Sequence, residues 1–131
     1  MTTSLTASLP PLSIEATLQR LYDESPRVDL GPTHRIVILS DLHLGDGGPQ
    51  DDFRQNAALV HDVLRDYYLE GGYSLVLNGD IEELQRFSYP KIRARWEAMF
   101  SLFAEFRRQR TLYTIIGTHD EALPCLVEKG V

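Results

Sequence analysis

Apolar residues recur at two spacings along the chain, and the alternation of these spacings predicts the order of its elements. Three short runs of aliphatic and β-branched residues predict strands at RIVILS (35–40), YSLVLN (73–78) and TLYTIIG (111–117). Between them, apolar residues repeat every three or four positions, which predicts amphipathic helices over about 51–70 and 90–106. This order is typical of an α/β fold with right-handed crossovers and a mainly parallel βαβαβ sheet.

Two further expectations concern the parts outside this alternation. Ser13 is a suitable N-cap residue for a short helix that we expect to end near Ser25 and Pro26. Residues 1–12 are rich in Ser and Thr and close with two prolines, which predicts a flexible tail ahead of one domain over 13–131. The apolar residues that share one face of the short helix are Ile14, Leu18, Leu21 and Tyr22.

Composition and charge narrow the class of protein. The 131 residues suffice for one domain, and 43% hydrophobic with 24% charged residues is typical of a globular protein. The net charge of −6 disfavours broad binding to nucleic acid or anionic lipid. The single cysteine, Cys125, cannot form an internal disulfide. Because the sequence has no signal-peptide pattern and no apolar run near the ~20 residues of a membrane span, we expect a cytoplasmic location.

Polar residues follow each predicted strand. Asp41 and His43 follow the first strand, residues 78–83 the second and residues 118–120 the third. Ligands of parallel sheets bind beyond the carboxyl ends of the strands, so these side chains are expected at one edge. Side chains at positions i and i+2 of a strand point to the same face, which predicts that Asp41 and His43 converge.

The residue types in these clusters suit a metal centre. Carboxylate and imidazole ligands without cysteine favour Mn²⁺, Fe, Zn²⁺ or Mg²⁺. Two such ions about 3.5–4 Å apart are a known device for phosphate ester hydrolysis, and a nearby histidine can protonate the leaving oxygen. Each cluster alone has a simpler interpretation, because an Asp and a His can cap a turn and Gly-Asp is a common turn pair.

Three segments together carry a family resemblance. SDLHLGD, NGDIEE and IIGTHDE resemble the first three sequence blocks of the calcineurin-like metallophosphoesterases, which read D-x-H, G-D-x-x-D/E and G-N-H-D/E. The match extends from Arg35 to Glu121. It implies hydrolysis of a phosphate monoester, diester or pyrophosphate in a phosphorylated small molecule or nucleotide, with two divalent ions, Mn²⁺ first among them. Within this class, the first two segments are also similar to bacterial members that cleave UDP-2,3-diacylglucosamine.

The resemblance also implies roles for individual residues. Asp41 and His43 would hold the first ion, and Asp80 would bridge both. His119 would act as general acid or transition-state stabiliser, oriented by Asp120. At the second ion Thr118 replaces the family's Asn, and its shorter, neutral hydroxyl predicts weaker binding there. Glu83 matches the acidic position of the second block, where we expect it to support the metal ligands or to fix the loop rather than to bind an ion directly.

Other features depart from the family pattern. The family supplies a later His and a G-H-x-H segment, and nothing after Glu121 resembles either. Its fold is a two-sheet sandwich, of which these residues provide only the first half, so we expect an apolar sheet face covered by the missing half or by self-association. The alternative function is a truncated, catalytically impaired remnant that acts as a binding or interaction module.

Two clusters in the last helical segment have structural interpretations. An aromatic stripe at helical spacing is most simply core packing, and it consists of Trp96, Phe100, Phe103 and Phe106. Arg107, Arg108 and Arg110 at the end of this segment predict a solvated helix end that complements the helix dipole, rather than a phosphate clamp.

Overall fold

A computed structural model describes residues 13–123 as two units, one ending at Gly31 and one beginning at Pro32. In the first unit, α1 (Ile14–Glu24) begins where the Ser13 hydroxyl accepts a hydrogen bond from the Ala16 amide at 3.2 Å. The N-cap and the end of this helix are confirmed. The expected tail over residues 1–12 and Cys125 lie outside the described residues.

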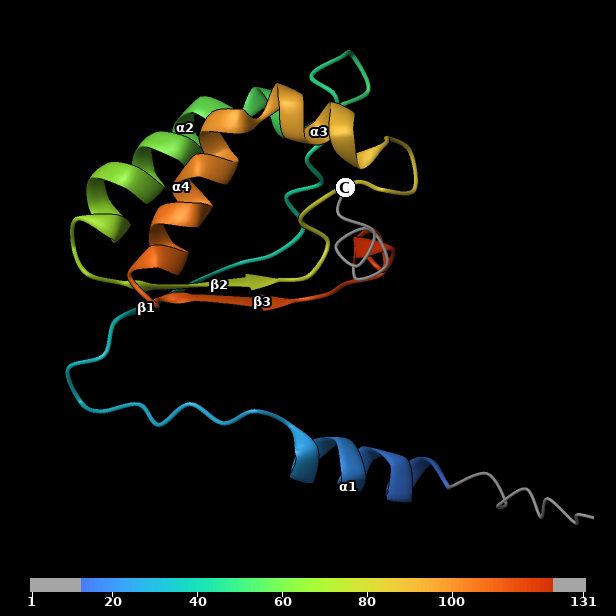
Figure 1. Cartoon of the computed structure of the whole chain (residues 1–131), viewed down its shortest axis with the longest axis vertical. Helices are drawn as coiled ribbons and strands as arrows, with labels where there is room; N and C mark the ends of the chain where they lie inside the picture. Colours follow the sequence, from blue (N-terminus) through green and yellow to red (C-terminus); the bar gives the residue numbers. More distant parts are fainter. Residues whose placement is uncertain (1–12, 124–131) are drawn as a thin grey trace, which may run out of the picture. The chain divides into compact units, whose positions relative to one another are not determined.

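The second unit contains a parallel three-stranded sheet. Its strands are β1 (Ile36–Leu39), β2 (Ser74–Asn78) and β3 (Leu112–Ile115), paired in the order β1-β2-β3. The strands follow the three predicted apolar runs, and helices connect them (Figure 1). The prediction of an α/β fold with a parallel βαβαβ sheet is therefore confirmed.

The helices of the second unit lie on one face of this sheet (Figure 1). Val37, Leu75 and Leu77 face them and are buried, together with the aromatic side chains of α4. On the other face, Ile38 is 62% exposed and Ile115 is 53% exposed. This face of the first strand is exposed because helices in the described part of this unit pack against one face of the sheet only.

The segment over 51–70 is less regular than predicted. It divides into a 3₁₀ turn at Asp52–Gln55, α2 (Ala57–Val63) and a π-helical turn at Leu64–Leu69. The wider π turn places Tyr68 half-buried against the core, whereas Tyr67 is 61% exposed. A regular 3.6-residue repeat therefore fails for the last turn of this segment.

The predicted helix over 90–106 is interrupted at Trp96. Helix α3 (Tyr89–Arg95) ends there and α4 (Glu97–Arg108) begins, because Trp96 leaves the helical conformation at φ −110°, ψ 32°. Its indole N–H donates to the Gly45 carbonyl at 3.0 Å and to the buried Asp51 carboxylate at 3.2 Å. The aromatic stripe forms the core as expected.

Among residues 13–123, no helix has the length and apolar character to cross a membrane.

Candidate metal centre

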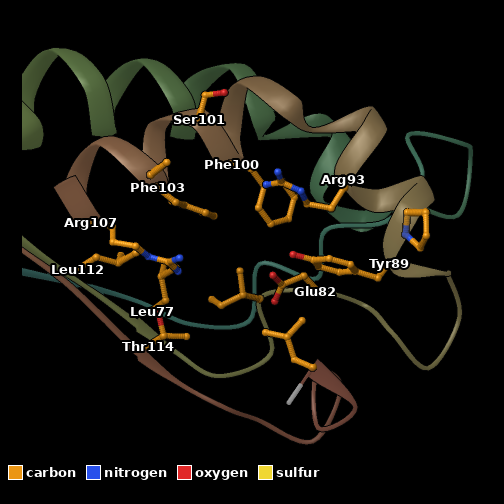
Figure 2. Close-up of a pocket in the computed structure, with 14 residues that line it drawn as sticks. Leu77, Glu82, Tyr89, Arg93, Phe100, Ser101, Phe103, Arg107, Leu112 and Thr114 are labelled. Atoms are coloured by element: carbon orange, nitrogen blue, oxygen red, sulfur yellow. The ribbon is translucent and has the colours of Figure 1, made fainter. Parts of the chain in front are cut away.

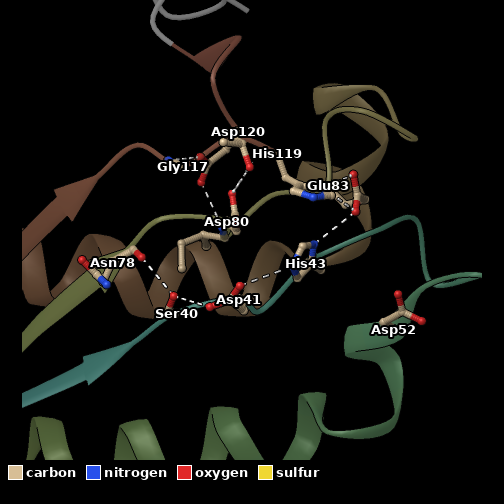
Figure 3. A network of polar contacts seen from close by, with 12 residues as sticks. Ser40, Asp41, His43, Asp52, Asn78, Asp80, Glu83, Gly117, His119 and Asp120 are labelled. Carbon is tan, nitrogen blue, oxygen red and sulfur yellow. Dashed lines mark hydrogen bonds and ion pairs between the residues drawn. The ribbon is translucent and has the colours of Figure 1, made fainter. Parts of the chain in front are cut away.

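Backbone hydrogen bonds join the loop after β1 to the loop after β2. The Asp41 amide donates to Gly79 at 3.2 Å, and the His43 amide donates to Asp80 at 3.1 Å. The Leu44 amide extends this pattern as a short parallel bridge beyond the sheet. These bonds hold two predicted site residues, His43 and Asp80, next to each other (Figure 3).

Side chains from all three strand ends meet at one place. His43, Asp80 and His119 each offer one ligand atom, and these atoms lie within 4.8 Å of one another. The two imidazole rings pack edge to face, with centroids 4.5 Å apart. Two imidazoles and a carboxylate form a donor set that suits a divalent ion such as Zn²⁺, Mn²⁺ or Fe. The described residues therefore fit a metal ion at this point.

Backbone conformation produces this convergence. Asp41, His43 and Asp80 have φ values of 56°, 51° and 54°, in the left-handed region that residues other than glycine seldom adopt. Such conformations cost free energy and cluster at functional sites. The expected reason for convergence, strand alternation at i and i+2, is wrong, because β1 ends at Leu39 and both residues lie in the following loop.

Asp80 is fixed by the loop that follows β3. Its Oδ1 accepts a hydrogen bond from the His119 amide at 2.8 Å and lies 3.5 Å from the Thr118 hydroxyl. The His119 amide hydrogen bond lowers the pKa of Asp80, so this carboxylate is ionised at neutral pH. A Cβ on Gly117 would lie 2.3 Å from Oδ1 of Asp80, so the close approach requires glycine.

Asp41 lies beside this group but is not one of its three members. Its Oδ1 is 3.8 Å from His43 Nε2, and its side chain is 67% exposed. The Ser40 hydroxyl donates to the other oxygen of Asp41 and to the Asn78 carbonyl (Figure 3). The structure thus places Asp41 at the edge of the cluster, and Thr118 next to Asp80 on the far loop.

Glu83 links the two histidines from behind. It is buried, and its carboxylate accepts hydrogen bonds from His43 Nδ1 at 3.1 Å and from His119 Nδ1 at 2.9 Å. This arrangement engages Nδ1 of both rings with Glu83 and leaves Nε2 of each ring to face another partner, as an acceptor when the ring is neutral and as a donor when it is protonated. The sequence predicted a supporting role for Glu83, either in holding the metal ligands or in fixing the loop, and the structure places its carboxylate against both histidine rings.

The role expected for Asp120 requires a correction. Its buried carboxylate accepts hydrogen bonds from the Ile81 amide at 2.9 Å and from the Gly117 amide. Asp120 therefore joins the loops after β2 and β3, while Glu83 contacts the His119 ring. A backbone-capping carboxylate and a ring-orienting carboxylate cannot be distinguished by their positions in the sequence alone.

The shared carboxylate changes the titration of its neighbours. The hydrogen bond to Glu83 raises the pKa of His119 above its ordinary value. For Glu83 itself, burial raises the pKa, but hydrogen bonds from His119 and His43 outweigh burial and leave the pKa below its usual range. Within the His119–Glu83 pair, a shared proton therefore resides on the imidazole of His119 rather than on the carboxylate of Glu83.

This pairing makes a direct prediction for Glu83→Gln. Removal of the negative charge lowers the pKa of His119, because the protonated ring loses its charged acceptor. We expect NMR titration of the imidazole signals in EDTA to show this downward shift relative to the unchanged protein. Glu121→Gln, at an exposed neighbouring position, serves as the matched control and leaves the pKa of His119 in place. An identical His119 titration in Glu83→Gln contradicts the pairing.

Comparison of the chain with protein-family models, with curated proteins and with solved structures found no match.

Proposed function

We propose that this chain hydrolyses phosphate esters or pyrophosphates at a divalent metal centre formed by the loops after β1, β2 and β3. One observation carries the proposal: the side chains of two proposed ligands, His43 and Asp80, and of the proposed proton donor, His119, converge from three strand ends, with one nitrogen or oxygen atom of each within 4.8 Å of the others. The resemblance of the three sequence blocks to metallophosphoesterases supports it. The substrate proposed is a phosphorylated small molecule or nucleotide.

The ligands proposed for the ions are Asp41, His43, Asp80 and Thr118. Asp80 is already ordered by the His119 amide, so its carboxylate needs little reorganisation to coordinate an ion. Divalent ions at such a site orient the phosphate, neutralise charge that develops on it and lower the pKa of water. Thr118 offers only a neutral hydroxyl, which favours weak binding at the second position.

His119 is the proposed proton donor to the leaving oxygen. Its Nδ1 contacts Glu83, so Nε2 is the nitrogen left to face a substrate. Glu83 is the proposed positioning residue, since its buried carboxylate orients this ring and stabilises its protonated form. Asp120 contributes by holding the loop that carries His119.

The test is Mn²⁺-dependent hydrolysis of bis(p-nitrophenyl) phosphate by the full chain. We expect His119→Gln to lower kcat by about 10²–10⁴-fold while Mn²⁺ binding, followed by EPR, is retained. We expect Thr118→Asn to lower the Mn²⁺ concentration for half-maximal activity by about tenfold. The proposal fails if neither the unchanged chain nor Thr118→Asn binds metal or hydrolyses the ester.

A non-catalytic binding module is the second candidate, favoured by the exposed apolar sheet face at Ile38 and Ile115. Such a module would have the same metal centre as the proposed hydrolase but would not hydrolyse the ester. Activity that appears only in Thr118→Asn, together with concentration-dependent self-association of the unchanged chain in sedimentation velocity, would favour this candidate over the enzyme.

A further inference from the structure

A second feature lies on the helix-covered side of the sheet, in a cavity of about 680 Å³ between α3, α4 and the β3 edge. Its walls include apolar side chains from β2, α4 and β3, which are Leu77, Phe100, Phe103 and Leu112 (Figure 2), and Ile81 from the loop after β2. This volume is within the range of small-molecule sites, about 300–1,000 Å³. The volume of the cavity is therefore sufficient for a short apolar chain.

Two of the three charged side chains at this cavity are cationic. Arg93 and Arg107 line it from α3 and α4, and Glu82 is the one carboxylate among its described lining residues. When Glu82 is ionised, the net charge of these three side chains is still +1. Figure 2 shows the side chains of Arg93 and Arg107 on either side of the apolar walls. The charge therefore favours an anionic occupant over a neutral or cationic one.

Both guanidinium groups keep their capacity to bind an anion. Within residues 13–123, no carboxylate lies within 4.0 Å of the Arg93 or Arg107 guanidinium, whereas Arg108 on the same helix pairs with Glu105. Arg93 stacks over the Phe100 ring at 4.4 Å, which holds it at the cavity wall while its N–H donors stay available. Arg107 is exposed in the last turn of α4, as expected of a solvated helix end, and it also lines the cavity.

We propose that this cavity binds an anionic amphiphile, a single alkyl chain that ends in a carboxylate or phosphate. The chain lies among the apolar walls, and the anionic head contacts one of the two guanidinium groups, Arg93 or Arg107, that stand on either side of them. Tyr89, which also lines the cavity, offers a neutral hydroxyl donor near the head. This site needs no metal, so its occupancy does not depend on the proposed hydrolysis.

The test is calorimetric titration of the full chain in EDTA with decanoate, decyl phosphate and decyltrimethylammonium, each below its micelle concentration. We expect both anions to bind, at least about tenfold more tightly than the cation. Comparison of the two anions shows which head group the arginines prefer. Absence of binding by both anions, or equal affinity for the cation, overturns the proposal.

Variants localise the binding. The double substitution Arg93→Gln and Arg107→Gln is expected to weaken anion binding about tenfold, because both guanidinium groups that can contact the head are removed. Arg108→Gln, on the same helix but paired with Glu105, is the matched control and leaves the affinity unchanged. Ala104→Phe, which narrows the cavity from α4, is expected to weaken binding of both anions. Circular dichroism checks that each variant is folded, and unchanged affinity in the folded double variant or in folded Ala104→Phe overturns the assignment.

Discussion

Asp80→Asn is expected to lower kcat/KM for the phosphodiester by about 10³-fold, since loss of a ligand charge removes several kcal/mol of transition-state stabilisation. Asp80 lies where the three loops meet, and its Oδ1 accepts the His119 amide. Asparagine retains an acceptor oxygen and tolerates the left-handed backbone at φ 54°. The substitution therefore removes the charge while the loop keeps its path, and Mn²⁺ affinity should fall with activity.

The matched control is Asp46→Asn in the loop after β1. It removes the same charge from an exposed residue whose Oδ1 accepts only the nearby Gly48 amide among the described contacts. We expect its activity and its Mn²⁺ affinity to stay within about twofold of the unchanged chain, because exposed charges are screened. Equal losses in the two variants would show that net charge, not the position of Asp80, governs metal binding.

Gly117→Ala is the second large effect, and it concerns stability. The added methyl group would lie 2.3 Å from Asp80 Oδ1 and 2.4 Å from the Asp80 amide nitrogen. Because one neighbour is backbone, the clash is relieved only if the loops after β2 and β3 separate. We expect urea unfolding in EDTA to show a loss of about 1–3 kcal/mol in the free energy of unfolding, together with weaker Mn²⁺ binding.

Gly72→Ala separates this steric clash from backbone strain. Gly72 has φ 71°, but a Cβ there meets no atom within 4 Å. Its substitution should cost only about 1 kcal/mol and leave Mn²⁺ affinity unchanged. If Gly117→Ala is as stable as the unchanged chain and binds Mn²⁺ equally, the tight packing of Gly117 on Asp80 is not required.

Much of the fold was predictable because its strands are short apolar runs with clear boundaries. The breaks within the helical segments were not, since each depends on contacts distant in sequence. Trp96 ends α3 as its indole reaches Gly45 and Asp51, about 50 residues away. The π turn after α2 similarly brings Tyr68 to the core rather than Tyr67. The periodicity of apolar residues predicts which face of a helix is buried, but it does not predict where the helix is interrupted.

The candidate site was predictable in its members more than in its contacts. The strand-end rule brought His43, Asp80 and His119 to one edge, and the structure places them together. The path of the loops decides which carboxylate accepts a hydrogen bond from the His119 ring. The sequence predicted Asp120, and in the structure the carboxylate is that of Glu83. The left-handed backbone conformation of Asp41 and His43 could not be predicted either, because neither Asp nor His requires that conformation.

The measurement that tests the central claim most directly is anomalous diffraction from crystals of the full chain grown with Mn²⁺. The account predicts a peak among the three loops, at coordination distance of about 2.0–2.3 Å from a nitrogen of His43 and an oxygen of Asp80. A fully occupied peak elsewhere, or saturating Mn²⁺ with no density at these side chains, would contradict a metal centre at the ends of β1, β2 and β3.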